Sequence, residues 1–192
     1  MDKCLICDSE YSPFVDFGFM PIANAFATKE QIKNEYTFPM KVGFCGNCNM
    51  VQLVEQPERE KMFHENYAFF SSTSNYMKEH FKLFANSVSE LQDLNENSFV
   101  VEVGCNDGIL LENFIIDHIP CLGIEPSENV AQVATEKGIE VITQFFDRPL
   151  AEHILQSHQK ADAILSANVM CHIPYMHSIF DGVKTLLKED GV

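Results

Sequence analysis

Two short pairs of cysteines near the amino-terminus constrain the fold of this chain more than any other feature. Cys4 and Cys7 enclose two residues, and so do Cys45 and Cys48. Two thiolates at this spacing reach one ion from a tight turn, and two such turns complete a four-cysteine site with no open position, which is typical of structural zinc. The spacing therefore predicts a zinc-binding module, with an iron–sulfur cluster or disulfides as the alternatives.

The remaining cysteines and the amino-terminal residues bear on the compartment. A disulfide framework requires an oxidising compartment, and the start of the chain, Met-Asp-Lys-Cys, contains no apolar run like that of a signal peptide. We therefore expect a cytoplasmic protein with reduced thiols. Cys105, Cys121 and Cys171 lie in apolar or strand-like surroundings and are expected to be buried small hydrophobic residues.

The charge of the chain excludes several classes of partner. Its 192 residues carry a formal net charge of −15, from 13 Lys and Arg against 28 Asp and Glu. Such a chain lacks a basic stripe that could neutralise phosphates, which argues against nucleic acid and against anionic membrane surfaces. No apolar run approaches the roughly 18 residues of a membrane span. These features leave a small-molecule substrate, which needs only a few local donors.

Three regions follow from the pattern of polar and apolar residues. Residues 1–54 have the features of a zinc ribbon, a module whose core is so small that the metal supplies much of its folding energy. Residues 55–97 form a connector of a loop and a helix. Residues 98–192 alternate between strands and helices, which predicts a parallel sheet with right-handed crossovers.

The connector contains a hydroxyl-rich loop and then a helix predicted at 77–94. The run Ser71–Asn75 lies between aromatic residues and predicts a loop that ends in a helix cap, with Ser74 or Asn75 as the capping residue. A binding loop for a polar ligand is the alternative. The helix places five apolar residues on one stripe, namely Met77, Phe81, Phe84, Val88 and Leu91.

A glycine turn follows the first strand of the third region. Gly104 permits a tight turn and a close backbone approach, and Gly108 opens the next helix. The spacing is not the Gly-x-Gly-x-x-Gly of dinucleotide-binding proteins, and Glu102 stands two residues before the first glycine. That acid suits a ligand with positive charge. Glu125 ends the next strand, where a carboxylate can reach a ribose diol. The alternative is that both acids are ordinary polar strand ends.

This pattern resembles the class I S-adenosylmethionine-dependent methyltransferases. The resemblance implies an α/β fold with a Rossmann-like sheet, in which the turn meets the methionine part of the cofactor and Glu125 holds the ribose. Asn106 stands where many members carry glycine, and a turn tolerates this because Asn adopts left-handed conformations. By resemblance, the cofactor-binding residues are Glu102, Gly104, Asn106, Asp107, Gly108, Glu125, Phe146 near the adenine, and Asn168.

A narrower resemblance takes in almost the entire chain. The two cysteine pairs, Tyr67 with Ser72–Tyr76, the glycine turn and Ala167–Pro174 together resemble the zinc-containing sugar C-methyltransferases. That family acts on nucleotide-linked 4-keto-6-deoxysugars in antibiotic and surface-polysaccharide pathways. The alternatives are O- or N-methylation of another small molecule, or an inactive fragment that binds zinc and cofactor.

The resemblance also assigns substrate-facing residues. Methylation next to a ketone needs a base and a group that polarises the keto oxygen. We expect His172, which follows the fourth strand, to polarise or help orient the keto oxygen. We expect Tyr76 to contact the substrate. Members of the family are longer and carry a carboxy-terminal domain. We therefore expect a sheet truncated after its fourth strand, and a missing domain that holds the principal base.

Overall fold

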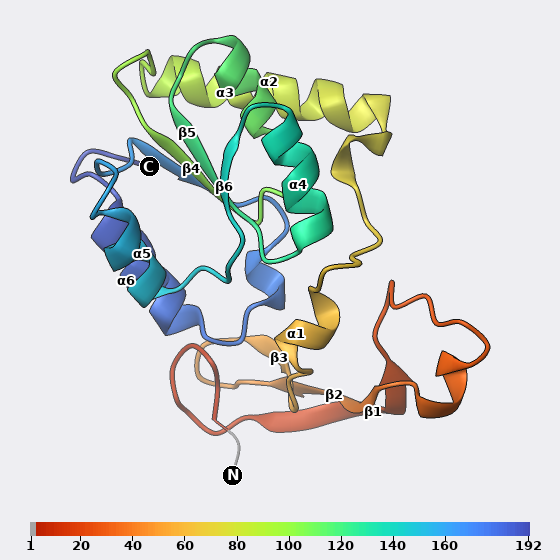
Figure 1. Cartoon of the computed structure of the whole chain (residues 1–192). Helices are drawn as coiled ribbons and strands as arrows, with labels where there is room; N and C mark the ends of the chain where they lie inside the picture. The colour runs from red at the N-terminus through yellow and green to blue at the C-terminus, as the bar shows by residue number, and fades with distance from the viewer. Residues whose placement is uncertain (1–2) are drawn as a thin grey trace. The chain divides into compact units, whose positions relative to one another are not determined.

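The computed structural model describes residues 3–192 and divides the chain into two compact units (Figure 1). The first unit holds the residues up to Ala68 together with Pro174–His177, and the second holds Phe69–Ile173 and Ser178–Val192. The region 55–97, expected to be a connector, is thus divided between the two units, and its long helix belongs to the second.

The first unit is built on a small antiparallel sheet in the order β1-β2-β3. The first cysteine pair precedes β1, and the second lies in the connection between β2 and β3. Both pairs therefore meet at one end of the sheet, as a zinc ribbon requires. Its elements are β1 (Ser12–Pro21), η1 (Gln31–Asn34), β2 (Thr37–Phe44), β3 (Val51–Leu53) and α1 (Arg59–Met62).

The second unit contains a sheet of four strands that all pair in parallel, in the order β6-β5-β4-β7. This confirms the predicted Rossmann-like α/β fold. Val192 lies beside β7, since its amide donates to Asp162 O (3.0 Å) and its carbonyl accepts from Ile164 N (2.8 Å). The strands are β4 (Val100–Val103), β5 (Cys121–Ile124), β6 (Glu140–Ile142) and β7 (Ala163–Leu165).

Helices cover both faces of this sheet. Figure 1 shows α5 and α6 together on one face, and α2 and α3 pack with the strands in one hydrophobic core on the other. The two central strands, β4 and β5, carry only buried side chains, as expected when helices cover both faces. The helices are η2 (Ser71–Thr73), α2 (Asn75–Leu91), α3 (Leu111–Ile116), α4 (Glu128–Glu136), α5 (Arg148–Ile154), η3 (Met170–His172) and α6 (Met176–Leu186).

Helix α2 has a predicted capping residue, but it spans Asn75–Leu91 rather than 77–94 and buries a different stripe. Ser74 is its amino-terminal cap, with Oγ accepting from Met77 N at 3.3 Å. The buried residues of the helix are Phe81, Ala85 and Val88, whereas Phe84 is 38% and Leu91 79% exposed. The predicted stripe was therefore wrong for Phe84 and Leu91. Its centre is Ala85, which is small enough to let α2 approach the core and which a search for large apolar residues passes over.

Two of the three remaining cysteines are buried. Cys105 and Cys121 are 1% and 8% exposed, as expected. Cys171 is exposed, so the prediction for it was wrong, because it lies in the short turn η3 rather than in a strand. No helix among residues 3–192 is both long enough and apolar enough to cross a membrane.

Candidate functional site

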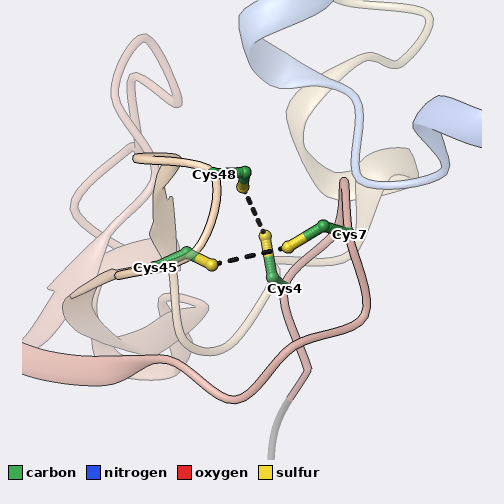
Figure 2. A group of neighbouring side chains, drawn as sticks. All are labelled: Cys4, Cys7, Cys45 and Cys48. Carbon is green, nitrogen blue, oxygen red and sulfur yellow. Dashed lines mark hydrogen bonds between the residues drawn. The ribbon is translucent and has the colours of Figure 1, made fainter.

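The four cysteines predicted to bind a metal come together in the first unit (Figure 2). All four sulfur atoms lie within 4.8 Å of one another, and the Cys4–Cys48 and Cys7–Cys45 sulfur pairs are each 3.5 Å apart. Sulfurs held at zinc–sulfur distance around one tetrahedral ion lie about 3.8 Å apart. The cluster therefore fits a single zinc ion whose four positions are all taken by protein.

The two cysteine turns share one backbone design. The amide of Asp8 donates to Cys4 O at 3.0 Å, and the amide of Asn49 donates to Cys45 O at 2.9 Å. Asp8 and Asn49 both adopt a left-handed conformation, with φ of 55° and 62°. Asp and Asn tolerate this region better than most residues. The residue that follows each cysteine pair thus closes the turn that carries the pair, a signal that the sequence analysis did not use.

Polar side chains support the first cysteine turn. Gln52 in β3 is buried, and its Oε1 accepts from Leu5 N at 2.9 Å, which ties the turn to the sheet. Hydrogen bonds with Asn47 and then Ser9 lower the pKa of Cys7 to about 5. The thiolate form that a zinc ion requires is therefore favoured at Cys7 at neutral pH. The backbone hydrogen bond from Met50 lowers the pKa of Cys48, but burial and the hydrogen bonds with the other three cysteines outweigh it and raise that pKa to about 12.

In the second unit, the glycine turn depends on two glycines that no other residue could replace without strain. Gly104 and Gly108 have φ of 76° and 77°. A Cβ on Gly104 would lie 2.4 Å from Val169 Cγ2, and one on Gly108 would lie 2.3 Å from Ile139 Cδ1. Gly104 N also donates to Ile124 O at 2.7 Å, which holds the turn against the end of β5.

Asn106 occupies the middle of this turn in a left-handed conformation, with φ of 49°. Its backbone amide donates to Glu125 Oε2 at 3.0 Å. Its side chain turns to the segment before α2, where Oδ1 accepts from Ser71 N at 2.9 Å and Nδ2 donates to Phe69 O at 3.0 Å. The backbone of Asn106 therefore faces the acid of β5, and its side chain holds a different segment.

Asp107 is fully buried, and its two oxygens differ. Oδ2 accepts two hydrogen bonds from Ser72, one from its amide at 2.9 Å and one from its hydroxyl at 2.7 Å. Oδ1 is buried and has no hydrogen-bond partner. A buried carboxylate oxygen without a donor is costly, and it is available to a ligand.

Glu125 follows β5 and is held by two backbone amides. Its oxygens accept from Ser127 N at 2.9 Å and from Asn106 N at 3.0 Å. Burial raises the pKa of this carboxyl, although the two hydrogen bonds oppose the shift. Each oxygen keeps a further lone pair, so the carboxylate can accept additional donors while its orientation stays fixed.

Of the three carboxyls, Glu102 in β4 lies in the surroundings least favourable to a negative charge. It is 2% exposed, and its Oε2 is buried without a hydrogen-bond partner. Burial, and then the charges of Glu125 and Asp107, raise the pKa of Glu102 well above its ordinary value. Within residues 3–192, none of the ion pairs involves any of the three carboxyls.

The three carboxyls therefore form an acidic cluster at the carboxyl ends of the neighbouring strands β4 and β5. The buried oxygens Glu102 Oε2 and Asp107 Oδ1 lack donors. A ligand that brings positive charge would satisfy them, and Glu125 can receive a diol at the same edge. S-adenosylmethionine has an ammonium, a sulfonium and a ribose diol, so the residues of this site fit it.

Phe146, predicted to lie near the adenine, is a buried residue. This residue is 3% exposed, and its Cζ lies 3.1 Å from where a Cβ on Gly182 of α6 would stand. The ring of Phe146 thus packs against α6, and its contact with the adenine stays a prediction. Asn168, by contrast, is exposed after β7 in a left-handed conformation, with φ of 58°.

The two residues predicted to face the substrate are accessible. Tyr76 is 80% exposed in the first turn of α2. His172 is exposed in η3, which follows the carboxyl end of β7. Their accessibility is compatible with substrate contact, and their roles stay hypotheses.

Two protein families match this chain. Residues 75–192 match the family described as "Methyltransferase domain". The chain belongs to this family. Residues 4–63 match a second family, described as "Putative zinc binding domain", which contains all four clustered cysteines. These matches confirm the predicted methyltransferase domain and the predicted zinc module.

Curated relatives extend the comparison. The chain is 29% identical over 194 residues to C-methyltransferase NovU of Streptomyces niveus, covering 100% of this chain and 46% of NovU. It is 29% identical over 96 residues to the ubiquinone biosynthesis O-methyltransferase of Salmonella paratyphi A, covering 48% of this chain and 39% of that protein. The chain thus spans less than half the length of these relatives.

Solved structures show a weaker likeness. Magnesium protoporphyrin IX methyltransferase from Synechocystis, with bound SAM, superposes with a TM-score of 0.46 at 18% identity, over 58% of this chain and 54% of that one. An S-adenosylmethionine-dependent methyltransferase from Clostridium acetobutylicum gives 0.48 at 19% identity, over 62% and 49%.

Proposed function

We propose that this chain is the zinc- and cofactor-binding part of an S-adenosylmethionine-dependent C-methyltransferase. Its acceptor is a carbon next to the keto group of a nucleotide-linked deoxysugar. The observation that carries the cofactor assignment is the acidic cluster, with its two buried oxygens that lack donors. The C-methyltransferase NovU, which is similar over the whole of this chain, supports transfer to carbon.

In this proposal, each carboxyl binds a different part of the cofactor. Glu125 is held in place by two backbone amides, and its remaining lone pairs accept hydrogen bonds from the ribose hydroxyls. Asp107 Oδ1 accepts from the ammonium group, while Ser72 keeps Oδ2 occupied. A nearby positive charge also lowers the pKa of a carboxyl, so Glu102 ionises more readily when the cofactor is in place.

The acceptor side requires two further functions. When bound, S-adenosylmethionine supplies a methyl group on a positively charged sulfur. A base must remove the α-proton of the ketone, and the charge that develops on the keto oxygen must be stabilised. In this proposal His172 stabilises the oxygen and Tyr76 orients the sugar. With the cofactor in place, its methyl group would move to the α-carbon with cleavage of its bond to sulfur, and the base would hold the α-proton.

We assign the principal base to a further domain of the whole protein. NovU, of which this chain covers 46%, is long enough to contain one. His172 lies after β7, at the edge where parallel α/β sheets bind ligands. A base supplied by a second domain would approach the acceptor from outside the sheet.

Native mass spectrometry of the purified chain, with and without S-adenosylhomocysteine, tests the cofactor and the metal together. We expect one zinc ion and one cofactor adduct, and we expect Glu125→Ala to lose the adduct but keep the zinc. Glu96→Ala is the matched control, because Glu96 is exposed in the loop before β4. Wild-type chain that carries zinc but binds no cofactor would contradict the assignment.

The acceptor is tested with the whole protein in deuterated water. A nucleotide-linked 4-keto-6-deoxysugar incubated with enzyme and S-adenosylhomocysteine should exchange its α-proton for deuterium without being methylated. O-methylation is the alternative, supported by the similarity to ubiquinone biosynthesis O-methyltransferases over 48% of the chain. An O-methyltransferase needs no carbon acid, so no α-exchange with S-adenosylhomocysteine, together with methyl transfer in a parallel reaction with S-adenosylmethionine, would favour it.

A further inference from the structure

The side chain of Asn106 joins the glycine turn to the segment that precedes α2. Its amide oxygen accepts from Ser71 N at 2.9 Å, and its amide nitrogen donates to Phe69 O at 3.0 Å. The two partners lie on either side of Phe70, whose backbone is extended just before η2, so the amide bonds to both sides of the point where η2 begins. Ser71 and Asn106 are 35 positions apart in the sequence, so this is a tertiary contact.

Few side chains could replace Asn106 in this role. The position has φ of 49°, and Asn is among the few non-glycine residues that adopt such a conformation at low cost. The contact also needs one group that donates and one that accepts. Asp offers only acceptors when ionised, and Gly offers no side chain, so neither meets both requirements.

A second pair of bonds fixes the same segment next to the first. Ser72 donates from its amide and its hydroxyl to Asp107 Oδ2, at 2.9 and 2.7 Å. Two successive residues of the glycine turn, Asn106 and Asp107, thus hold the 69–73 segment through four hydrogen bonds. Asp107 is fully buried beneath these contacts, with Oδ1 left unpartnered.

We propose that Asn106 is a positioning residue that keeps the 69–73 segment closed over the glycine turn and thereby slows release of the cofactor. The proposal deepens the cofactor assignment and rests on it. Asn106 does not have to touch the cofactor with its side chain, because both side-chain groups are already bonded to Phe69 and Ser71. It holds Ser72 in place, and Ser72 in turn fixes the orientation of Asp107.

The two side-chain hydrogen bonds of Asn106, which form a tether to the 69–73 segment, also affect the proposed substrate-binding side of the site. The 69–73 segment leads directly into the cap Ser74 and the first turn of α2, which carries Tyr76. Closure of this segment over the glycine turn therefore also sets the place of Tyr76 in the second unit. One amide group couples the cofactor side of the site to a residue proposed for the substrate side.

Amide hydrogen exchange of the ligand-free chain tests the tether without any cofactor. Asn106→Gly keeps the left-handed backbone and removes both side-chain bonds. Two ordinary hydrogen bonds correspond to roughly a thirtyfold change in an opening equilibrium. We expect the amides of Ser71 and Ser72 to exchange roughly thirtyfold faster, with β4 and α3 unchanged. Asn24→Gly is the control, because Asn24 is exposed with φ of 66°.

Dissociation of S-adenosylhomocysteine, measured by stopped flow, tests the consequence. Asn106→Gly should release it at least several-fold faster than wild type, and Asn106→Asp, which keeps an acceptor but loses the donor, should do the same. Unchanged exchange at Ser71 would overturn the tether. Faster exchange with an unchanged release rate would overturn its role in holding cofactor. A wild-type chain that binds no S-adenosylhomocysteine would instead contradict the cofactor assignment, which the exchange data do not depend on.

Discussion

Replacing Gly108 by alanine should destabilise the second unit by about 2–5 kcal/mol. Gly108 has φ of 77°, where an L-residue costs about 1–2 kcal/mol. Its new Cβ would also lie 2.3 Å from Ile139 Cδ1 and 3.0 Å from Ala134 Cβ. Both neighbours are buried, and forcing an extra carbon into a packed core costs about 1–3 kcal/mol.

Gly138→Ala separates these two contributions. Gly138 has φ of 87°, but no atom lies within 4 Å of a Cβ built there, so this variant should lose only the backbone contribution of about 1–2 kcal/mol. Urea unfolding followed by the helical circular dichroism signal is a suitable assay, because helices α2–α6 lie almost entirely in the second unit.

A shorter side chain at position 139 should partly rescue Gly108→Ala. Ile139→Val removes Cδ1, the atom that the new methyl group would meet, so the double variant should recover part of the stability that Gly108→Ala loses. Equal losses in Gly108→Ala and Gly138→Ala, or no recovery in the double variant, would refute the reasoning.

Two further predictions concern the acidic cluster and the metal. Burial, and then the charges of Glu125 and Asp107, raise the pKa of Glu102 well above its ordinary 4.5, so the native chain keeps a proton that the unfolded chain releases. The free energy of unfolding from this group should therefore fall as the pH rises above 4.5, and Glu102→Gln should flatten the slope in urea titrations across pH. Removing zinc with a chelator should expose the amides of β1–β3 to rapid exchange and leave α2–α6 protected; strands that stay protected would show that the metal is not needed. Cys45→Ser should behave like the chelated chain, whereas Cys171→Ser should keep its zinc.

The sequence was sufficient for those parts of the fold that depend on spacing. The cysteine pairs and the alternation of strands with helices each predict their structures from local pattern, and the structure confirms both. Phe146 shows the limit of such reasoning. Two adjacent phenylalanines follow β6, and which of them is buried depends on where α6 packs, a contact that no local pattern contains.

The acidic site was predictable only in part. Glu102 and Glu125 stand at strand ends that must meet in a parallel sheet, so their proximity follows from topology. The bonds from Ser72 to Asp107 do not, since they join residues 35 positions apart. The hydroxyl-rich run could be recognised as either a helix cap or a binding loop. In the structure it is a cap through Ser74 and also holds the turn through Ser72.

The unequal exposure of the thiols makes the chain ready for optical labelling. Four of the seven cysteines form the metal cluster, and burial raises the pKa of Cys105 and of Cys121, which suppresses their nucleophilic form. Cys171 alone is exposed. A maleimide dye should therefore attach next to His172 in the zinc-loaded wild-type chain, and its fluorescence would report on the loop after β7 as substrates are added, with no residue replaced.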